Sequence, residues 1–197
     1  MYVTTEAIVL SLEPVSDKAQ VAHVYTRTGG RERYKVFGLG RRHAIGVYSP
    51  LSLVQLTTDK TSVRTAQLTY VPQTLMTDAR KRAVALFISE VLYHTLRYPM
   101  TDERMFDFLA NAVRALDETE EPQNFHLRFL IDFAAMLGFG MESSQQSAIS
   151  PQLSAVGHPL TRKERQEALR TLCTYFEQHV ETWQNPRSLE ILIEVFD

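Results

Sequence analysis

The stretch VAHVYTRTGGRERYKVF at residues 21–37 decides the fold of the first part of the chain. Val21 to Thr26 alternates between two faces, which is typical of a half-buried strand. Thr28-Gly29-Gly30 predicts a turn, because glycine accepts a positive φ without steric cost. Arg31 to Phe37 then resumes the period of two, so the stretch predicts a β-hairpin.

Three more strands are predicted around this hairpin. Val3 to Leu12 is rich in Thr, Val, Ile and Leu and stops at Glu13-Pro14. Leu51 to Thr57 and Ser62 to Val71 flank a polar turn at residues 58–61 and form a second hairpin candidate. Five strands in about seventy residues predict a small closed barrel, which removes exposed strand edges.

The apolar period changes to that of helices in the rest of the chain. Helices are predicted over Asp78–Arg97, Glu103–Leu116, Pro122–Leu137, a segment from Thr161 to the break at Asn185-Pro186, and Ser188–Val195. Thr161 and Glu164 have the spacing of a capping box, and Gly138 is a predicted C-terminal cap. Residues 141–157 are polar and predict a loop.

Composition and charge narrow the class of protein. The chain has 197 residues, 44% of them hydrophobic and 22% charged, as in one or two globular domains. The formal net charge of −2 conceals an asymmetry, because residues 1–80 carry +4 and residues 81–197 carry −6. Seven Lys or Arg and one acid lie between Lys18 and Arg42. Such a stretch favours an anionic partner, although a solvated face would look the same.

Several locations and activities are disfavoured by what the sequence lacks. The apolar runs are too short to span a bilayer, and the first residues do not have the pattern of a secretory signal. The single cysteine, Cys173, excludes an internal disulfide and a cysteine-based zinc cluster. A cytoplasmic location is therefore predicted. Cys173 lies on the apolar stripe of its predicted helix, where a buried thiol is expected.

No enzyme motif is apparent. The six histidines include no pair at metal-binding helical spacing, and no serine lies in a GxSxG elbow. Gly38-Leu39-Gly40 begins like a phosphate-binding loop, but His43 stands at the third glycine position. We therefore predict no catalytic residue, metal or cofactor.

The candidate binding residues lie on and after the second strand of the first hairpin. Arg31, Arg33 and Lys35 share one face at a spacing of about 7 Å, a scale on which cations can follow a phosphate backbone. Arg41 and Arg42 follow beyond the glycines. Aromatic faces beside cations suit single-stranded nucleic acid, because bases stack without regard to sequence. Tyr25, Tyr34, Phe37 and Tyr48 lie in or near this region; the first two are expected in the core, and Phe37 and Tyr48 are the better stacking candidates.

Six segments in order resemble the RecO family of bacterial recombination mediators. They are 5–10, Val24–Arg31, Tyr48–Leu51, Ala85–Leu92, Arg128–Gly140 and Arg187–Leu192. The resemblance therefore covers nearly the whole chain. The chain departs from it twice. The four zinc-binding cysteines that many members carry are absent, so the zinc-finger insert is absent too. Phe37-Gly38-Leu39-Gly40 stands where many members have Lys-Gly-Ala-Arg.

The resemblance implies an α+β protein, with an OB-fold five-stranded β-barrel at residues 1–74 and an all-α, partner-binding domain at residues 75–197. It implies a non-enzymatic mediator that binds single- and double-stranded DNA and anneals strands. It also implies binding to the acidic tail of single-stranded-DNA-binding protein, cooperation with RecR in loading RecA, and a cytoplasmic, nucleoid-associated location. Arg128 is the position that matches the tail-binding motif.

Two alternatives remain open. The chain could be a protein-interaction scaffold with little intrinsic DNA binding, in which case the basic strand is only solvated. It could also be an enzyme that acts on nucleic acid through a site that no motif reveals. Affinity for DNA at moderate salt would distinguish the scaffold, and turnover with added Mg²⁺ would distinguish the enzyme.

Overall fold

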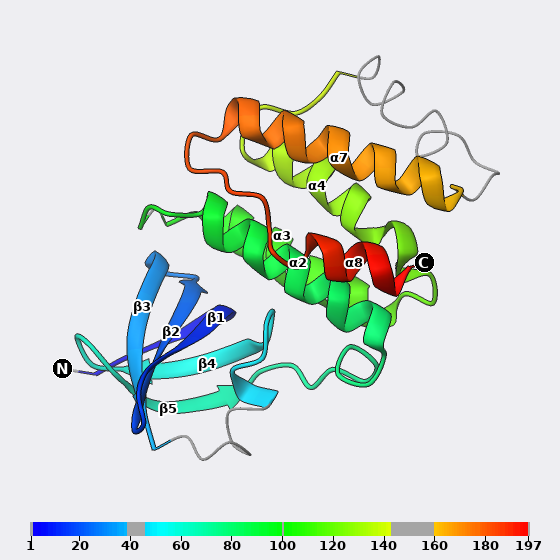
Figure 1. Cartoon of the computed structure of the whole chain (residues 1–197). Helices are drawn as coiled ribbons and strands as arrows, with labels where there is room; N and C mark the ends of the chain where they lie inside the picture. The colour runs from blue at the N-terminus through cyan, green and yellow to red at the C-terminus, as the bar shows by residue number, and fades with distance from the viewer. Residues whose placement is uncertain (1, 39–45, 100, 143–159, 197) are drawn as a thin grey trace.

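The computed structural model describes residues 2–38, 46–99, 101–142 and 160–196. A five-stranded barrel lies beside a layer of helices, with α2 and α3 nearest the barrel and α4 and α7 farther away (Figure 1). The strands are β1 (Val3–Ser16), β2 (Ala19–Thr26), β3 (Gly30–Phe37), β4 (Leu53–Thr58) and β5 (Val63–Leu68). The helices are α2 (Ala79–Thr95), α3 (Glu103–Glu118), the 3₁₀ turn η1 (Pro122–Asn124), α4 (Phe125–Met136), α7 (Arg162–His179) and α8 (Leu189–Val195).

The strands form one antiparallel sheet in the order β3-β2-β1-β4-β5, and the sheet closes on itself. A parallel bridge joins Lys35 of β3 to Ser62 just before β5, and the Lys35 N–H donates to the Thr61 carbonyl oxygen at 2.8 Å. The order of the strands around the barrel is therefore β1-β2-β3-β5-β4, which is the arrangement of an OB-fold. This confirms the fold class that the sequence predicts.

The barrel interior contains the side chains that alternate inward. They are Ala7, Val9, Ala22, Val24, Tyr34, Val36, Tyr48, Val54 and Leu56, all buried. Tyr34 and Val36 point inward, while Arg33 and Lys35, which alternate with them, are exposed. The period of two in the sequence is thus realised on this strand.

The first strand is longer than the sequence predicts. β1 continues through Pro14 to Ser16, so the prediction that it stops at Glu13-Pro14 is wrong. The pairing of β1 with β2 is irregular between Pro14 and Ser16, and β4 pairs only with Val3 to Ile8. Pro14 therefore lies where β1 has a single partner, and a residue without an N–H is tolerated at such an edge.

One apolar core spans the barrel and the helices. Ile8, Leu10 and Tyr25 project from the outer face of the barrel into the same buried cluster as Phe87 and Val91 of α2. Burial of each side chain of this size stabilises the folded protein by about 1.5–3 kcal/mol. The division at residues 74 and 75 stays a prediction, because this core continues across it.

The helix ends follow the sequence signals. Thr161 and Glu164 form the predicted capping box, and Gly138 has a φ of 89° after α4. Asp78 caps α2, accepting from the Arg80 N–H at 2.7 Å. At the third predicted helix, Pro122 begins a 3₁₀ turn and the α-helix starts only at Phe125. α7 ends at His179, before the break at Asn185-Pro186.

A buried carboxylate fixes the segment between the barrel and α2. Asp117 of α3 is 3% exposed and accepts hydrogen bonds from the N–H groups of Gln73, Thr74 and Leu75 at 2.6–2.8 Å and from the Tyr70 hydroxyl at 2.7 Å. Burial alone would raise the pKa of Asp117, but these hydrogen bonds outweigh it and hold the pKa well below its usual range. The orientation of α2 against the barrel is thereby fixed at its N-terminal end.

Candidate nucleic-acid interface

The outer face of β2 and β3 is covered by α2 at one end and open at the other. Tyr25 lies in the core, but the next outward residues along β2, His23 and Val21, lie in a groove. They are paired with Arg33 and Lys35 of β3. The groove has a volume of about 610 Å³ and adjoins a second one of about 860 Å³ that reaches the last turn of α2. OB-folds bind oligonucleotides on this face.

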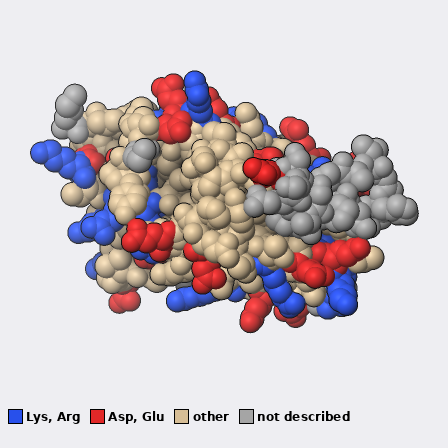
Figure 2. Space-filling view, turned by 90° about the horizontal axis from the view of Figure 1, so that it is seen from above, with Lys and Arg blue, Asp and Glu red and all other residues tan. Residues whose placement is uncertain are grey.

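Arg33 and Lys35 are the predicted binding residues that the structure leaves available. Both are exposed and line the groove from β3. Lys60, in the β4–β5 turn that lies beside β3, lines the same groove. Figure 2 shows Lys and Arg side chains at the end of the molecule where the barrel lies, with acidic side chains among them. Three cations around one groove can bind the phosphates of a backbone.

Arg31 is half-buried and makes structural contacts. Its Nη1 donates to the Tyr93 carbonyl oxygen at 3.3 Å, and its guanidinium carbon lies 4.2 Å from the centre of the Tyr93 ring. Its Nη2 lies 3.2 Å from His23 Nδ1. Arg31 therefore joins β3 to the end of α2. The sequence pattern predicts a different role, that of a binding cation on the same face as Arg33. Arg41 and Arg42 lie outside the described residues.

His23 connects this contact to β1. Its Nε2 lies 3.3 Å from Glu13 Oε2, and its ring lies edge-on against Tyr93. Burial and the neighbouring Arg31 lower the pKa of His23, in that order of size, and Glu13 opposes them only in part. A neutral ring, with the proton on Nε2, can accept from Arg31 at Nδ1 and donate to Glu13.

Lys60 and Arg97 also line these grooves, and the sequence pattern does not point to them because neither lies in a basic run. The turn that carries Lys60 is ordered by Asp59, whose carboxylate accepts from the Thr61 and Ser62 N–H groups at 2.9 and 2.7 Å. These hydrogen bonds hold the pKa of Asp59 below its usual range. Arg97 follows α2 and lines the larger groove together with Arg33. The signal for Lys60 was its position in the β4–β5 turn, which takes part in binding in OB-folds.

The aromatic candidates divide into buried and exposed rings. Tyr25 and Tyr34 are buried, as expected. Tyr48 is also buried, inside the barrel, and burial raises its pKa to about 12, so the interpretation of Tyr48 as a stacking residue is wrong. Phe37 is 59% exposed at the end of β3 and stays a stacking candidate.

Arg128 lies apart from the groove, exposed on α4 in the helical layer. The next residues, Phe129 and Leu130, are core residues, as expected. Asp132 lies one helical turn further on; burial raises the pKa of Asp132 and Arg128 lowers it. Arg128 thus carries a positive charge on a surface separate from that of Arg33 and Lys35.

Other candidate chemistry is not supported among the described residues. Cys173 is buried in α7, and burial raises its pKa to about 12. The described ranges contain no group of three His, Cys, Asp or Glu placed to hold a metal ion. No helix within them is long and apolar enough to cross a membrane. Most of the polar segment 141–157 lies outside the described residues.

The closed barrel, its groove and the helical layer packed on it define an OB-fold protein with a helical domain attached. Residues 76–155 match the family model described as "Recombination protein O C terminal". The chain is 28% identical to the DNA repair protein RecO of Flavobacterium johnsoniae, over the full length of both chains. It is 30% identical to that of Porphyromonas gingivalis over 70% of this chain and 61% of the relative. It is 26% identical to that of Phocaeicola vulgatus over 98% of both chains. The chain belongs to the RecO family of DNA repair proteins.

Proposed function

We propose that this chain is a recombination mediator without catalytic activity, which binds single- and double-stranded DNA through the groove on β2 and β3. The observation that carries the proposal is the set of exposed cations around that groove, Arg33 and Lys35 on β3 and Lys60 on the adjoining β4–β5 turn. Each cation that neutralises a phosphate releases counterions, which favours binding entropically.

The same groove explains why such binding would be independent of sequence. Long flexible cations contact phosphates, which are alike at every base. Val15 and Val21 also line the groove and offer apolar contact but no hydrogen-bonding pattern that could read a base edge. Binding of this kind suits a protein that brings complementary strands together, and we propose strand annealing as its consequence.

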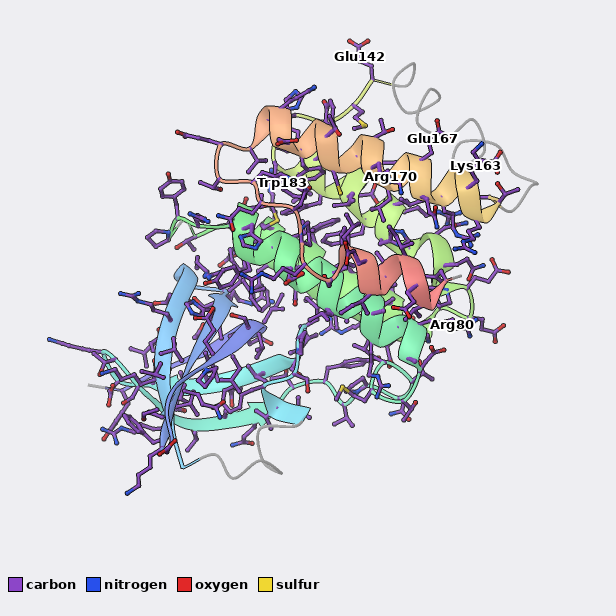
Figure 3. The ribbon with its side chains drawn as sticks, in the orientation of Figure 1. Arg80, Glu142, Lys163, Glu167, Arg170 and Trp183 are labelled. Carbon is purple, nitrogen blue, oxygen red and sulfur yellow. The ribbon has the colours of Figure 1, made fainter. Side chains whose placement is uncertain are left out.

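The experiment is a fluorescence anisotropy titration of a labelled oligonucleotide at several salt concentrations. We expect Arg33→Ala/Lys35→Ala to weaken binding of all sequences alike and to reduce the slope of log affinity against log salt by about 1.4 for single strands, or about 0.7 per lost contact. Lys163→Ala/Arg170→Ala is the matched control, because these exposed cations lie on α7, across the helical layer from the barrel (Figure 3). Equal effects in the two double variants would refute the groove as the DNA site.

Arg31 is left out of the groove test, since its replacement would also disturb the contact with α2. Arg31, Arg41 and Arg42 remain predicted members of the DNA site. The variant Arg41→Ala/Arg42→Ala tests the last two in the same titration. Wild-type protein that fails to bind any DNA at low salt would favour the protein-interaction scaffold.

We further propose that the helical layer binds the acidic tail of single-stranded-DNA-binding protein at Arg128, and that the chain works with RecR to load RecA. Support for the tail site is an exposed cation on α4 next to partly buried aromatic residues such as Phe125. Arg128→Glu should weaken binding of an acidic tail peptide and leave DNA affinity unchanged. Loss of DNA binding in the same variant would contradict two separate sites.

A further inference from the structure

Two exposed aromatic residues end the two segments that bring cations to the groove, β3 and the segment after α2. Phe37, 59% exposed, ends β3. Tyr98, 67% exposed, follows α2 by three residues and comes directly after Arg97, which lines the groove. Both residues belong to the small set of large apolar side chains that the described part of the chain leaves exposed.

The end of the groove where Tyr98 lies is fixed by contacts to the β2–β3 turn. The Thr101 hydroxyl donates to the Thr28 carbonyl oxygen at 2.9 Å, so the segment after α2 lies over the start of β3 (Figure 1). Arg31, near that start, is held against Tyr93 of α2. Phe37 is six residues further along the strand, which corresponds to about 20 Å.

The cations of the groove come from several segments. Arg33 and Lys35 follow each other on one face of β3, and Lys60 lines the groove from the adjoining β4–β5 turn. Arg97 adds a cation from the helical part of the chain. Aromatic rings that flank a row of cations provide what an unpaired strand needs, namely stacking for bases and charge for phosphates.

We propose that the groove binds a short single strand, with one base stacked on Phe37 and one on Tyr98, so that the helical domain supplies part of the DNA site. The inference rests on the proposed DNA-binding function and assigns its preferred substrate. The length of β3 from Arg31 to Phe37, about 20 Å, corresponds to the short end of the 4–16 nucleotides that an OB-fold covers. Duplex DNA would engage the cations alone, because its base faces are already stacked within the helix.

The experiment compares Phe37→Ala and Tyr98→Ala with wild-type protein on three probes of one length: a thymidine oligonucleotide, the same backbone with abasic sites, and a duplex. Loss of a stacked base is worth about 1–3 kcal/mol, so each variant should bind the thymidine strand about 5- to 150-fold more weakly. Affinity for the duplex and for the abasic strand should stay within about twofold, and the salt slope should not change, because no phosphate contact is lost.

The controls separate stacking from folding. Tyr98→Phe keeps the ring and should bind like wild type, and Ile191→Ala removes an exposed apolar side chain on α8, away from the groove. Equal losses on the thymidine and abasic strands, or no loss on either, would overturn the stacking sites while the DNA-binding function stands. Wild-type protein that binds none of the three probes would refute the function and the inference together.

Discussion

The two halves of the outer face of β2 and β3 have the same strand geometry and opposite roles. At one end, Tyr25 is 3% exposed and contributes to the core beneath α2. At the other, Arg33 and Lys35 are exposed beside an open groove. The difference arises where α2 ends, at Thr95. A neighbouring helix, and not the strand itself, thus decides which outward residues form the core and which can meet a ligand.

The largest effect on the free energy of unfolding is expected in the part of the barrel surface that the helices cover. Ile8→Ala should lower the free energy of unfolding by about 2–5 kcal/mol, because Ile8 is fully buried and its loss leaves a cavity. Val15→Ala on the same strand should change it by less than about 0.5 kcal/mol, since Val15 is 64% exposed. Both residues lie on β1, which continues this outer surface next to β2, with Ile8 in the core and Val15 in the groove. Urea denaturation measures both variants, and similar values would contradict the division into a covered and an open part.

A smaller effect is expected at the boundary between the two halves. Arg31→Ala should lower the free energy of unfolding by about 1–3 kcal/mol, because it removes the hydrogen bond to the Tyr93 carbonyl and the contact with its ring. Arg33→Ala should leave stability within about 0.5 kcal/mol of wild type. Thermal denaturation of the two variants tests the comparison, which fails if Arg33→Ala proves the more destabilising change.

The smallest effect is a dependence on pH at His23. Its folded-state pKa is lowered, so its contribution to stability is present above its unfolded pKa of about 6.5 and is lost as the pH falls through the folded pKa. His23→Gln should flatten the stability profile over the pH range just below 6.5, because the group that titrates there is removed. Denaturation midpoints at pH 7.5 and pH 5 measure it. An unchanged difference between the two midpoints would show that His23 does not titrate in this way.

The periodic elements were predictable from sequence because their signals are local. The hairpin at residues 21–37 has two alternating strands around a glycine turn, and all three features occur in the structure. The capping box at Thr161 and Glu164 depends only on residues three apart. Such features are largely independent of the rest of the chain.

The site was predictable only in part because it depends on contacts between distant elements. Arg31 and Arg33 have equivalent places in the strand pattern, and the approach of Tyr93 from α2 gives Arg31 a different role. Tyr48 could not be distinguished from Phe37 by sequence, since only the closure of the barrel buries it. Lys60 is an isolated basic residue until its turn is placed beside β3.

The parallel bridge between β3 and the start of β5 would link the proposed binding of a polyanion to local opening of the barrel. The seam includes the hydrogen bond from the Lys35 N–H to Thr61, and the side chains of Lys35 and Lys60 line the groove at the same seam. A polyanion bound to both lysines would hold the two strand edges together, while separation of the edges would break that binding site. The exchange rate of the Lys35 amide hydrogen with deuterated water would then report occupancy of the groove from within the backbone.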